Sequence, residues 1–212
     1  MNEYLVPFEA AETAFSEKRS RFLGRICRVE SENAARAVID EEKKKYYDAR
    51  HHCWSYLIRE GGIIRYSDDG EPQGTAGQPI LNVLQRRCIT NVCCVVTRYF
   101  GGTLLGTGGL TRAYGRSAQE TLKAAGICRM SLWSCTDIPC TYSLLKQTKS
   151  EIVACGGMVR GIEYGTEALI HAAFPKEEAE KFLPRLEEIS AGEFFMREVG
   201  EEFLPGNRED GI

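Results

Sequence analysis

The sequence predicts an α+β protein of two domains, residues 1–130 and 131–212. An apolar run over residues 92–97 favours a buried strand, and a glycine-rich segment joins it to a helical pattern. After residue 130 the expected order is strand, helix, strand, strand, helix, strand. The charge also changes along the chain: residues 1–132 hold 19 Lys and Arg against 15 Asp and Glu, whereas the remaining 80 hold 8 against 15.

The first domain is expected to alternate strands and helices around the strand at 92–97. Ser31 is a good N-cap for the first helix, and Pro79 suits the first turn of the second. Gly61 and Gly62 predict a two-residue hairpin turn. The expected elements are strands at 13–15 and 22–26, a helix from 32 to about 47, strands at 53–59 and 63–66, and helices at 79–87 and from 110 to about 125.

The second domain has the βαββαβ order of a ferredoxin-like unit. Ser143 is expected to cap its first helix, which should end at Gly156 and Gly157. Residues 200–212 are polar and are expected to form a loose tail. The expected strands are 132–142, 158–164, 167–174 and 194–199, and a second helix is expected to start at 176.

The glycine-rich segment is the first candidate site. Its spacing resembles a Walker A loop, but Thr107 stands where Lys is needed, and the dinucleotide fingerprint also fails. What remains is a helix start that can hold an anion with the help of nearby arginines. Alternatively, the glycines only allow close packing and the arginines are solvated. The candidate anion-binding residues are Arg98, Gly101, Gly102, Gly106, Gly108, Gly109, Arg112 and Arg116.

Two further motifs carry reactive side chains. His51, His52 and Cys53 stand together, which suits a metal site or a Cys-His nucleophile, but neither set is complete and a structural role is the simpler interpretation. Asp68, Asp69 and Glu71 could bind Mg²⁺ with a phosphorylated substrate, or they form a solvated turn. No residue is assigned a catalytic role, and no metal or cofactor is expected.

Composition excludes several classes of protein. The mean hydropathy is −0.29, and no run approaches the roughly 18 apolar residues of a membrane span. The first residues lack the features of a secretory signal, so we expect a cytoplasmic protein without membrane association. Nine cysteines without C-x-x-C spacing indicate buried small side chains rather than zinc ligands or disulfides.

Three sequence blocks together resemble the Impact/YigZ family, in its two-domain, bacterial-type form. They are H-H-C-W-S-Y-L-I from His51, S-D-D-G-E-P-Q-G-T-A-G-Q-P-I-L from Ser67, and R-Y-F-G-G-T-L-L-G-T-G-G-L-T-R-A-Y from Arg98. The resemblance implies a first domain like domain IV of elongation factor G, followed by the ferredoxin-like domain. For eukaryotic members it implies translational control through a protein partner. It supplies no catalytic residues.

The favoured hypothesis is a non-enzymatic, translation-linked protein whose basic first domain binds RNA or the ribosome. A second hypothesis is an enzyme that processes a phosphorylated or nucleotide substrate, with the glycine-rich loop as anion cradle and Asp68, Asp69 and Glu71 holding Mg²⁺. A third is an adaptor that binds a protein partner through the ferredoxin-like domain.

Overall fold

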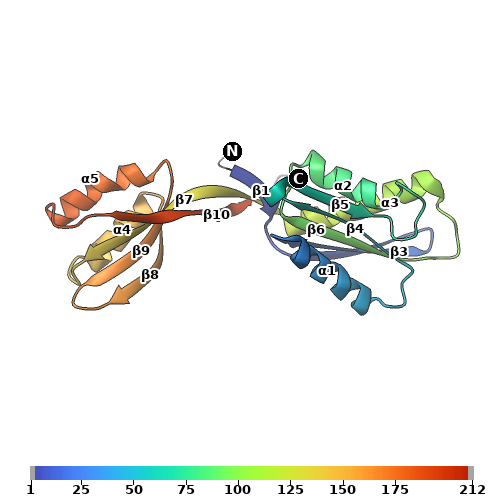
Figure 1. Cartoon of the computed structure of the whole chain (residues 1–212), viewed down its shortest axis with the longest axis horizontal. Helices are drawn as coiled ribbons and strands as arrows, with labels where there is room; N and C mark the ends of the chain where they lie inside the picture. Colours follow the sequence, from blue (N-terminus) through green and yellow to red (C-terminus); the bar gives the residue numbers. More distant parts are fainter. Residues whose placement is uncertain (1–2, 210–212) are drawn as a thin grey trace. The chain divides into compact units, whose positions relative to one another are not determined.

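The computed structural model describes residues 3–209, which form two compact units (Figure 1). The first unit contains Glu3–Arg129 together with 205–209, and the second contains Met130–Leu204. Strands β7 (Ile127–Cys140) and β10 (Arg197–Glu209) pair with each other, and each has residues in both units. Helices and largely antiparallel sheets confirm the predicted α+β class. No helix between residues 3 and 209 combines the length and apolarity needed to cross a membrane.

The first unit is built on a sheet of strand order β2-β3-β6-β4-β5, with antiparallel neighbours. Strand β6 lies between β3 and β4, and its side chains from Val92 to Val96 have no solvent exposure, as predicted for a central strand. The strands are β2 (Ala11–Glu17), β3 (Ser20–Arg28), β4 (His51–Ile58), β5 (Ile63–Ser67) and β6 (Val92–Tyr99); the short β1 (Glu3–Pro7) pairs with β7.

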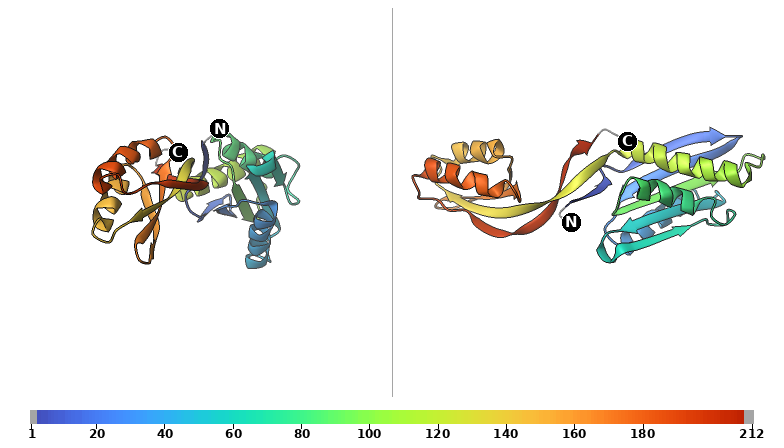
Figure 2. Two further views of the ribbon diagram at one scale, coloured as in Figure 1. Left: turned by 60° about the vertical axis from the view of Figure 1, so that its left-hand side comes forward. Right: turned by 90° about the horizontal axis from the view of Figure 1, so that it is seen from above.

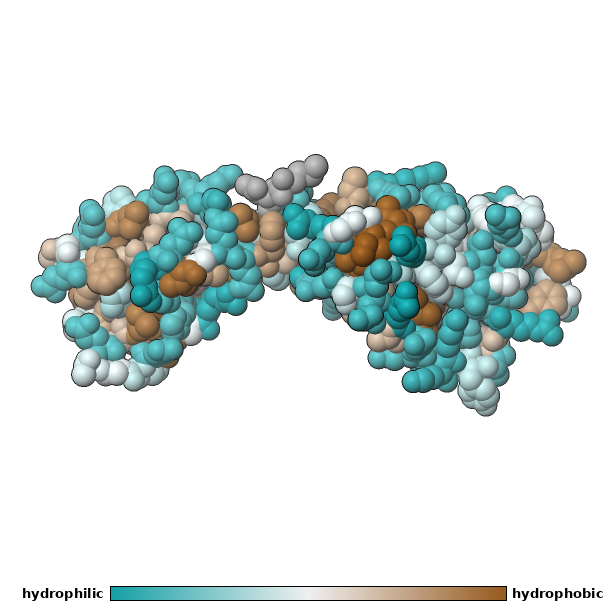
Figure 3. All heavy atoms as spheres, viewed as in Figure 1, coloured by the Kyte–Doolittle hydropathy of each residue, from teal (hydrophilic) through white to brown (hydrophobic). Residues whose placement is uncertain are grey.

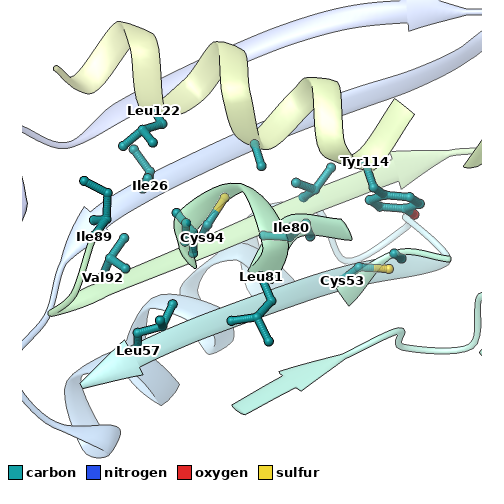
Figure 4. Close-up of a cluster of buried hydrophobic side chains, with 14 of the residues drawn as sticks. Ile26, Cys53, Leu57, Ile80, Leu81, Ile89, Val92, Cys94, Tyr114 and Leu122 are labelled. Carbon is teal, nitrogen blue, oxygen red and sulfur yellow. The ribbon is translucent and has the colours of Figure 1, made fainter. Parts of the chain in front are cut away.

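Helices cover both faces of this sheet (Figures 1 and 2). Helix α1 (Glu32–Lys45) packs on the face of Cys93 and Val95, and α2 (Gly77–Arg86) and α3 (Gly106–Ala125) pack on the face of Cys94 and Val96. Figure 4 shows Leu122 and Tyr114 of α3 directed toward that second face. Because both faces are buried, β6 has the continuous apolar sequence that identified it.

Two boundaries differ from the sequence prediction. Helix α3 begins at Gly106 rather than near residue 110, so three of the five glycines are helical. Gly106 has a positive φ of 69°, which favours glycine at this first position, and Leu105 and Leu110 beside it pack against the core. The β4–β5 hairpin closes through residues 59–62, including a 3-10 turn (Glu60–Gly62), rather than through two residues.

The second unit has the order β7, α4 (Leu145–Ala154), β8 (Met158–Tyr164), β9 (Ala168–Pro175), α5 (Ala179–Ser190), β10. Its strands are arranged β10-β7-β9-β8, and both helices pack on one face of them. Ile152 of α4 and Phe182 of α5 are fully buried there against Ile138 and Ile170. The observed βαββαβ order agrees with the element order expected for this half of the chain.

Two details of this half were predicted incorrectly. Residues 200–209 belong to β10 and are not a loose tail, because pairing with β7 satisfies their backbone; residues 210–212 lie outside the described part. Ser143 does not cap α4, whose N-cap is Leu144. The Ser143 hydroxyl instead contacts the Thr141 hydroxyl at 3.0 Å.

The uncovered face of β7 and β9 carries a cross-strand ion pair. His171 Nδ1 lies 2.7 Å from Asp137 Oδ1, Arg197 donates to Asp137 Oδ2 at 3.0 Å, and Glu163 lies 3.3 Å from His171 Nε2. The bond to Asp137 raises the pKa of His171 above its ordinary value of 6.5. Protonated His171 therefore stabilises the folded second unit, and this contribution is complete below pH 6.5 and is lost as pH rises through the folded pKa.

We expect His171→Gln to destabilise the second unit more at pH 6 than at pH 8. The measurement is urea unfolding followed by Trp133 fluorescence in a Trp54→Phe background, since the chain has only these two tryptophans. A difference between wild type and variant that does not change with pH would contradict the assignment of the proton to His171.

Candidate functional site

The glycine-rich segment lies against the turn between β2 and β3. A Cβ atom built on Gly101 would lie 2.0 Å from the carbonyl carbon of Arg19, so the two backbones are in direct contact. Lys18 and Arg19 form the turn with positive φ values of 45° and 68° and are exposed. The β2–β3 turn, the loop 100–105 and the first turn of α3 therefore occupy one end of the first unit.

The N-terminus of α3 lacks the groups that usually satisfy a helix start. Its N-cap, Leu105, provides no side-chain hydrogen bond, and the first turn contains no acidic residue. Thr107 and Gly108 are exposed. The first N–H groups of a helix have no partner within the helix, and the dipole of this 20-residue helix makes its start favourable for an anion.

Arg98 has a structural role that the sequence did not reveal. Its guanidinium donates to Glu71 Oε1 at 2.7 Å and to Ser20 Oγ at 3.1 Å, and the Arg98 and Glu71 side chains are only 5% and 3% exposed. Tyr114 Oη also donates to Glu71 Oε1, at 2.8 Å, and the Gly101 N–H donates to Ser20 Oγ at 3.2 Å. The buried Arg98–Glu71 pair thus fixes the glycine-rich loop to the sheet, and Glu71 balances the charge of Arg98.

Arg112 and Arg116 instead lie at the surface, beside the β2–β3 turn. Both line a pocket of about 250 Å³ with Lys18, Gly109, Phe15, Glu17, Leu105 and Ala113. Arg116 donates to Glu120 at 2.7 Å, and its guanidinium lies 4.3 Å from the centre of the Phe15 ring. Arg112 is exposed and makes no ion pair within residues 3–209. Arg112 is therefore available to a ligand, whereas Arg116 is partly engaged.

A second pocket, of about 370 Å³, also borders the start of α3. Gly106 and Thr107 line it together with Arg50, His51, Glu71, Pro72, Arg98, Phe100, Leu104, Leu105 and Leu110. Phe100 is 44% exposed and Leu104 is 83% exposed. Figure 3 shows hydrophobic atoms gathered where Figure 1 draws the loop between β6 and α3. This end of the unit therefore presents apolar and cationic groups side by side.

His51, His52 and Cys53 connect β4 to its neighbours. His51 Nδ1 contacts the Asp69 carbonyl at 2.9 Å, and His52 Nε2 contacts the Tyr46 carbonyl at 3.1 Å. The Cys53 thiol donates to the Asp68 carbonyl at 3.0 Å, and burial raises its pKa. These contacts give each side chain a structural partner, and a thiol with a raised pKa is a poor nucleophile.

The acidic side chains of Asp68, Asp69 and Glu71 face three different sets of partners. Asp68 accepts from the N–H groups of Gly74, Ala76 and Gly77 at 2.8–3.0 Å and so holds the start of α2. Asp69 Oδ2 accepts from the His52 N–H at 2.7 Å, and Glu71 is paired with Arg98. Among residues 3–209, no three His, Cys, Asp or Glu side chains are grouped to hold a metal ion.

Comparison with known proteins covers most of the chain. Residues 18–122 match the model of the Impact N-terminal domain. The chain is 34% identical to the IMPACT family member YvyE of Bacillus subtilis over 93% of this chain and 92% of that protein, and 30% identical to YigZ of Escherichia coli over 95% and 100%. A crystal structure of a hypothetical protein, 30% identical, superposes with a TM-score of 0.60 over 94% of this chain and 98% of that one. On this similarity along nearly its whole length, the chain belongs to the IMPACT family.

Proposed function

We propose that the end of the first unit around the start of α3 binds RNA, free or in the ribosome. The observation that carries the proposal is a group of exposed cationic side chains without an ion-pair partner in the described part of the chain: Lys18, Arg19, Arg50 and Arg112. Lys18 and Arg112 share one pocket, Arg50 lines the other, and the backbone of Arg19 contacts the loop between them. They surround a helix start that itself favours anions.

The chemistry of this surface suits single-stranded RNA. Phosphates would pair with the four cations and with the first N–H groups of α3, and their counterions would be released into solution. Phe100 offers an exposed aromatic face on which a base can stack, beside the cationic groups of the pocket. Family membership is consistent with this role, because the family resemblance implies a link to translation. Arg98 lines the same pocket, but its side chain is only 5% exposed and is paired with Glu71, so we assign the phosphate contacts to the exposed cations.

The test compares two triple variants with the same change in charge. Lys18→Gln/Arg19→Gln/Arg112→Gln removes three cations from the proposed surface. Arg86→Gln/Arg87→Gln/Lys123→Gln removes three exposed cations from the other ends of α2 and α3. Binding to a labelled single-stranded RNA and to purified ribosomes is measured by fluorescence anisotropy and co-sedimentation at low and physiological salt.

We expect the first triple variant to bind RNA at least about ten-fold more weakly. Each lost phosphate contact lowers the slope of log affinity against log salt by about 0.7, so three contacts lower it by about 2. The control variant should retain most of the wild-type affinity and slope. Equal loss in both variants would mean that only net charge matters, and absence of RNA or ribosome binding by the folded wild type would overturn the proposal.

A further inference from the structure

Two cationic side chains of the second unit differ from its other Lys and Arg side chains in making no ion pair with a described residue. Five of its Lys and Arg side chains form ion pairs: Lys176 with Glu201, Lys181 with Glu178, Arg185 with Glu188, Arg197 with Asp137, and Arg160 with Glu202. Lys146 and Lys149 are exposed and make no ion pair with any described residue. Acidic residues outnumber basic ones in this half of the chain, so these two lysines form a local cationic site in an otherwise acidic part of the sequence.

Both lysines line a shallow groove along α4. The groove has a volume of about 580 Å³, and its other lining residues are Tyr142, Leu145, Ser150 and Val153. Lys146 and Lys149 are three residues apart, which places them next to each other on the helix surface. Val153 is 63% exposed although it is aliphatic, and Tyr142 is 51% exposed. The groove therefore combines apolar lining side chains with two cations.

The aromatic side of the groove is held in place. The rings of Tyr142 and Tyr164 are stacked, with centroids 6.4 Å apart and an angle of 6° between their planes. The Tyr142 hydroxyl donates to the Gly165 carbonyl at 2.8 Å, which ties the ring to the turn between β8 and β9. Two large exposed side chains that are already ordered lose little conformational entropy when a partner covers them.

From this arrangement we propose that the α4 groove docks an acidic amphipathic helix of a protein partner. An apolar side chain of that helix would cover Val153 and the ring of Tyr142, while two of its carboxylates would pair with Lys146 and Lys149. This is the helix-in-groove mode of recognition, in which apolar anchors supply affinity and flanking charges set orientation. The acidic surroundings favour a segment with few, well-placed carboxylates over a nucleic acid, whose many phosphates would meet repulsion beyond the two lysines.

The experiment uses the full chain and a panel of fluorescein-labelled designed peptides. Each peptide is a short amphipathic helix with one Leu, Phe or Trp anchor and a pair of Glu residues on the same face. A neutral panel has Gln in place of Glu, and a charge-reversed panel has Lys. The variant is Lys146→Glu/Lys149→Glu, and the control is Lys181→Glu/Arg185→Glu on α5, which makes the same change in net charge.

We expect a member of the acidic panel to bind wild type and the α5 control alike, and to bind Lys146→Glu/Lys149→Glu about ten-fold more weakly. The charge-reversed peptide should bind Lys146→Glu/Lys149→Glu more tightly than it binds wild type. A misfolded variant could not show this gain in affinity. Equal affinity of the neutral peptides, or no binding by any panel member, would overturn the proposal. Two other results would also overturn it. The groove would serve a different partner if the wild-type chain bound single-stranded RNA, or formed a dimer, and Lys146→Glu/Lys149→Glu abolished that binding or dimerisation.

The α4 groove lies in the second unit and does not depend on RNA binding by the first. The first-unit variant Lys18→Gln/Arg19→Gln/Arg112→Gln should therefore bind the acidic peptide with wild-type affinity. The proposal for RNA binding and the proposal for the α4 groove are therefore tested independently by these experiments.

Discussion

Glu71→Gln should lower the free energy of unfolding of the first unit by about 3–5 kcal/mol. The substitution keeps the size of the side chain but removes the charge that balances Arg98, whose side chain is 5% exposed. A buried cation without its counter-charge has lost its hydration and gains no Coulombic compensation. Tyr114 would also lose a charged acceptor for its hydroxyl group. Chemical unfolding followed by Trp54 fluorescence in a Trp133→Phe background reports on this unit, because Trp54 lies in β4.

Glu120→Gln is the matched control for Glu71→Gln. It makes the same chemical change in the Arg116–Glu120 pair, whose side chains are 52% and 40% exposed. Exposed ion pairs contribute at most about 1 kcal/mol, so this variant should be close to wild type. Similar losses in the free energy of unfolding of the two variants would show that burial does not determine how much the Arg98–Glu71 pair contributes to stability. The double variant Glu71→Leu/Arg98→Met should recover part of the lost stability, because it removes both buried charges.

Gly101→Ala should destabilise the first unit by about 3 kcal/mol, near the upper end of the usual cost of overpacking. The added Cβ would lie 2.0 Å from the carbonyl carbon of Arg19 and 2.3 Å from the backbone nitrogen of Ser20. These are main-chain atoms of a tight turn, which cannot rotate away as a flexible side chain could. Relief requires the loop to separate from the β2–β3 turn and to break the Gly101 hydrogen bond to Ser20.

Gly115→Ala, in the neighbouring helix, should change stability in the opposite direction to Gly101→Ala. Nothing lies within 4 Å of a Cβ built on Gly115, which is inside α3. This variant should be more stable than wild type by about 1 kcal/mol, since alanine favours a helix. Thermal or urea unfolding of both variants measures the contrast. A mild loss in Gly101→Ala, comparable to that of an ordinary surface change, would contradict the close backbone contact.

Elements defined by local signals could be predicted from the sequence. Val92 to Val96 identify a central strand because a strand buried on both faces must be apolar on both faces. Ser31 caps α1 as expected, with its hydroxyl accepting from the Ala34 N–H at 3.2 Å. In the second unit, helical and alternating patterns gave the correct order of elements. In each case the information lies within a few residues of the element that it specifies.

Features that depend on distant contacts could not be predicted in this way. Arg98 and Glu71 are 27 residues apart, and nothing near either residue signals that they meet in the core. Helix α3 starts at Gly106 although glycine has a low helix propensity, and the packing of Leu105 and Leu110 against the core is a contact with distant residues that the local sequence does not show. Strand β10 has a polar sequence and exists because β7 lies beside it. The candidate site combines both kinds of information: Arg112 is exposed, as a binding residue must be, whereas Arg98 is buried in an ion pair with Glu71 that the sequence did not indicate.

The division of the chain into units has a consequence for synthesis on the ribosome. The first unit includes residues 205–209, and Arg208 donates to Glu9 at 2.9 Å while Glu209 lies 3.2 Å from Arg129. During translation these partners emerge only after the whole second unit has been made. A nascent chain that has reached residue 130 does not yet contain Arg208 and Glu209. These contacts of the first unit therefore form last, although most of the sequence of that unit is made first.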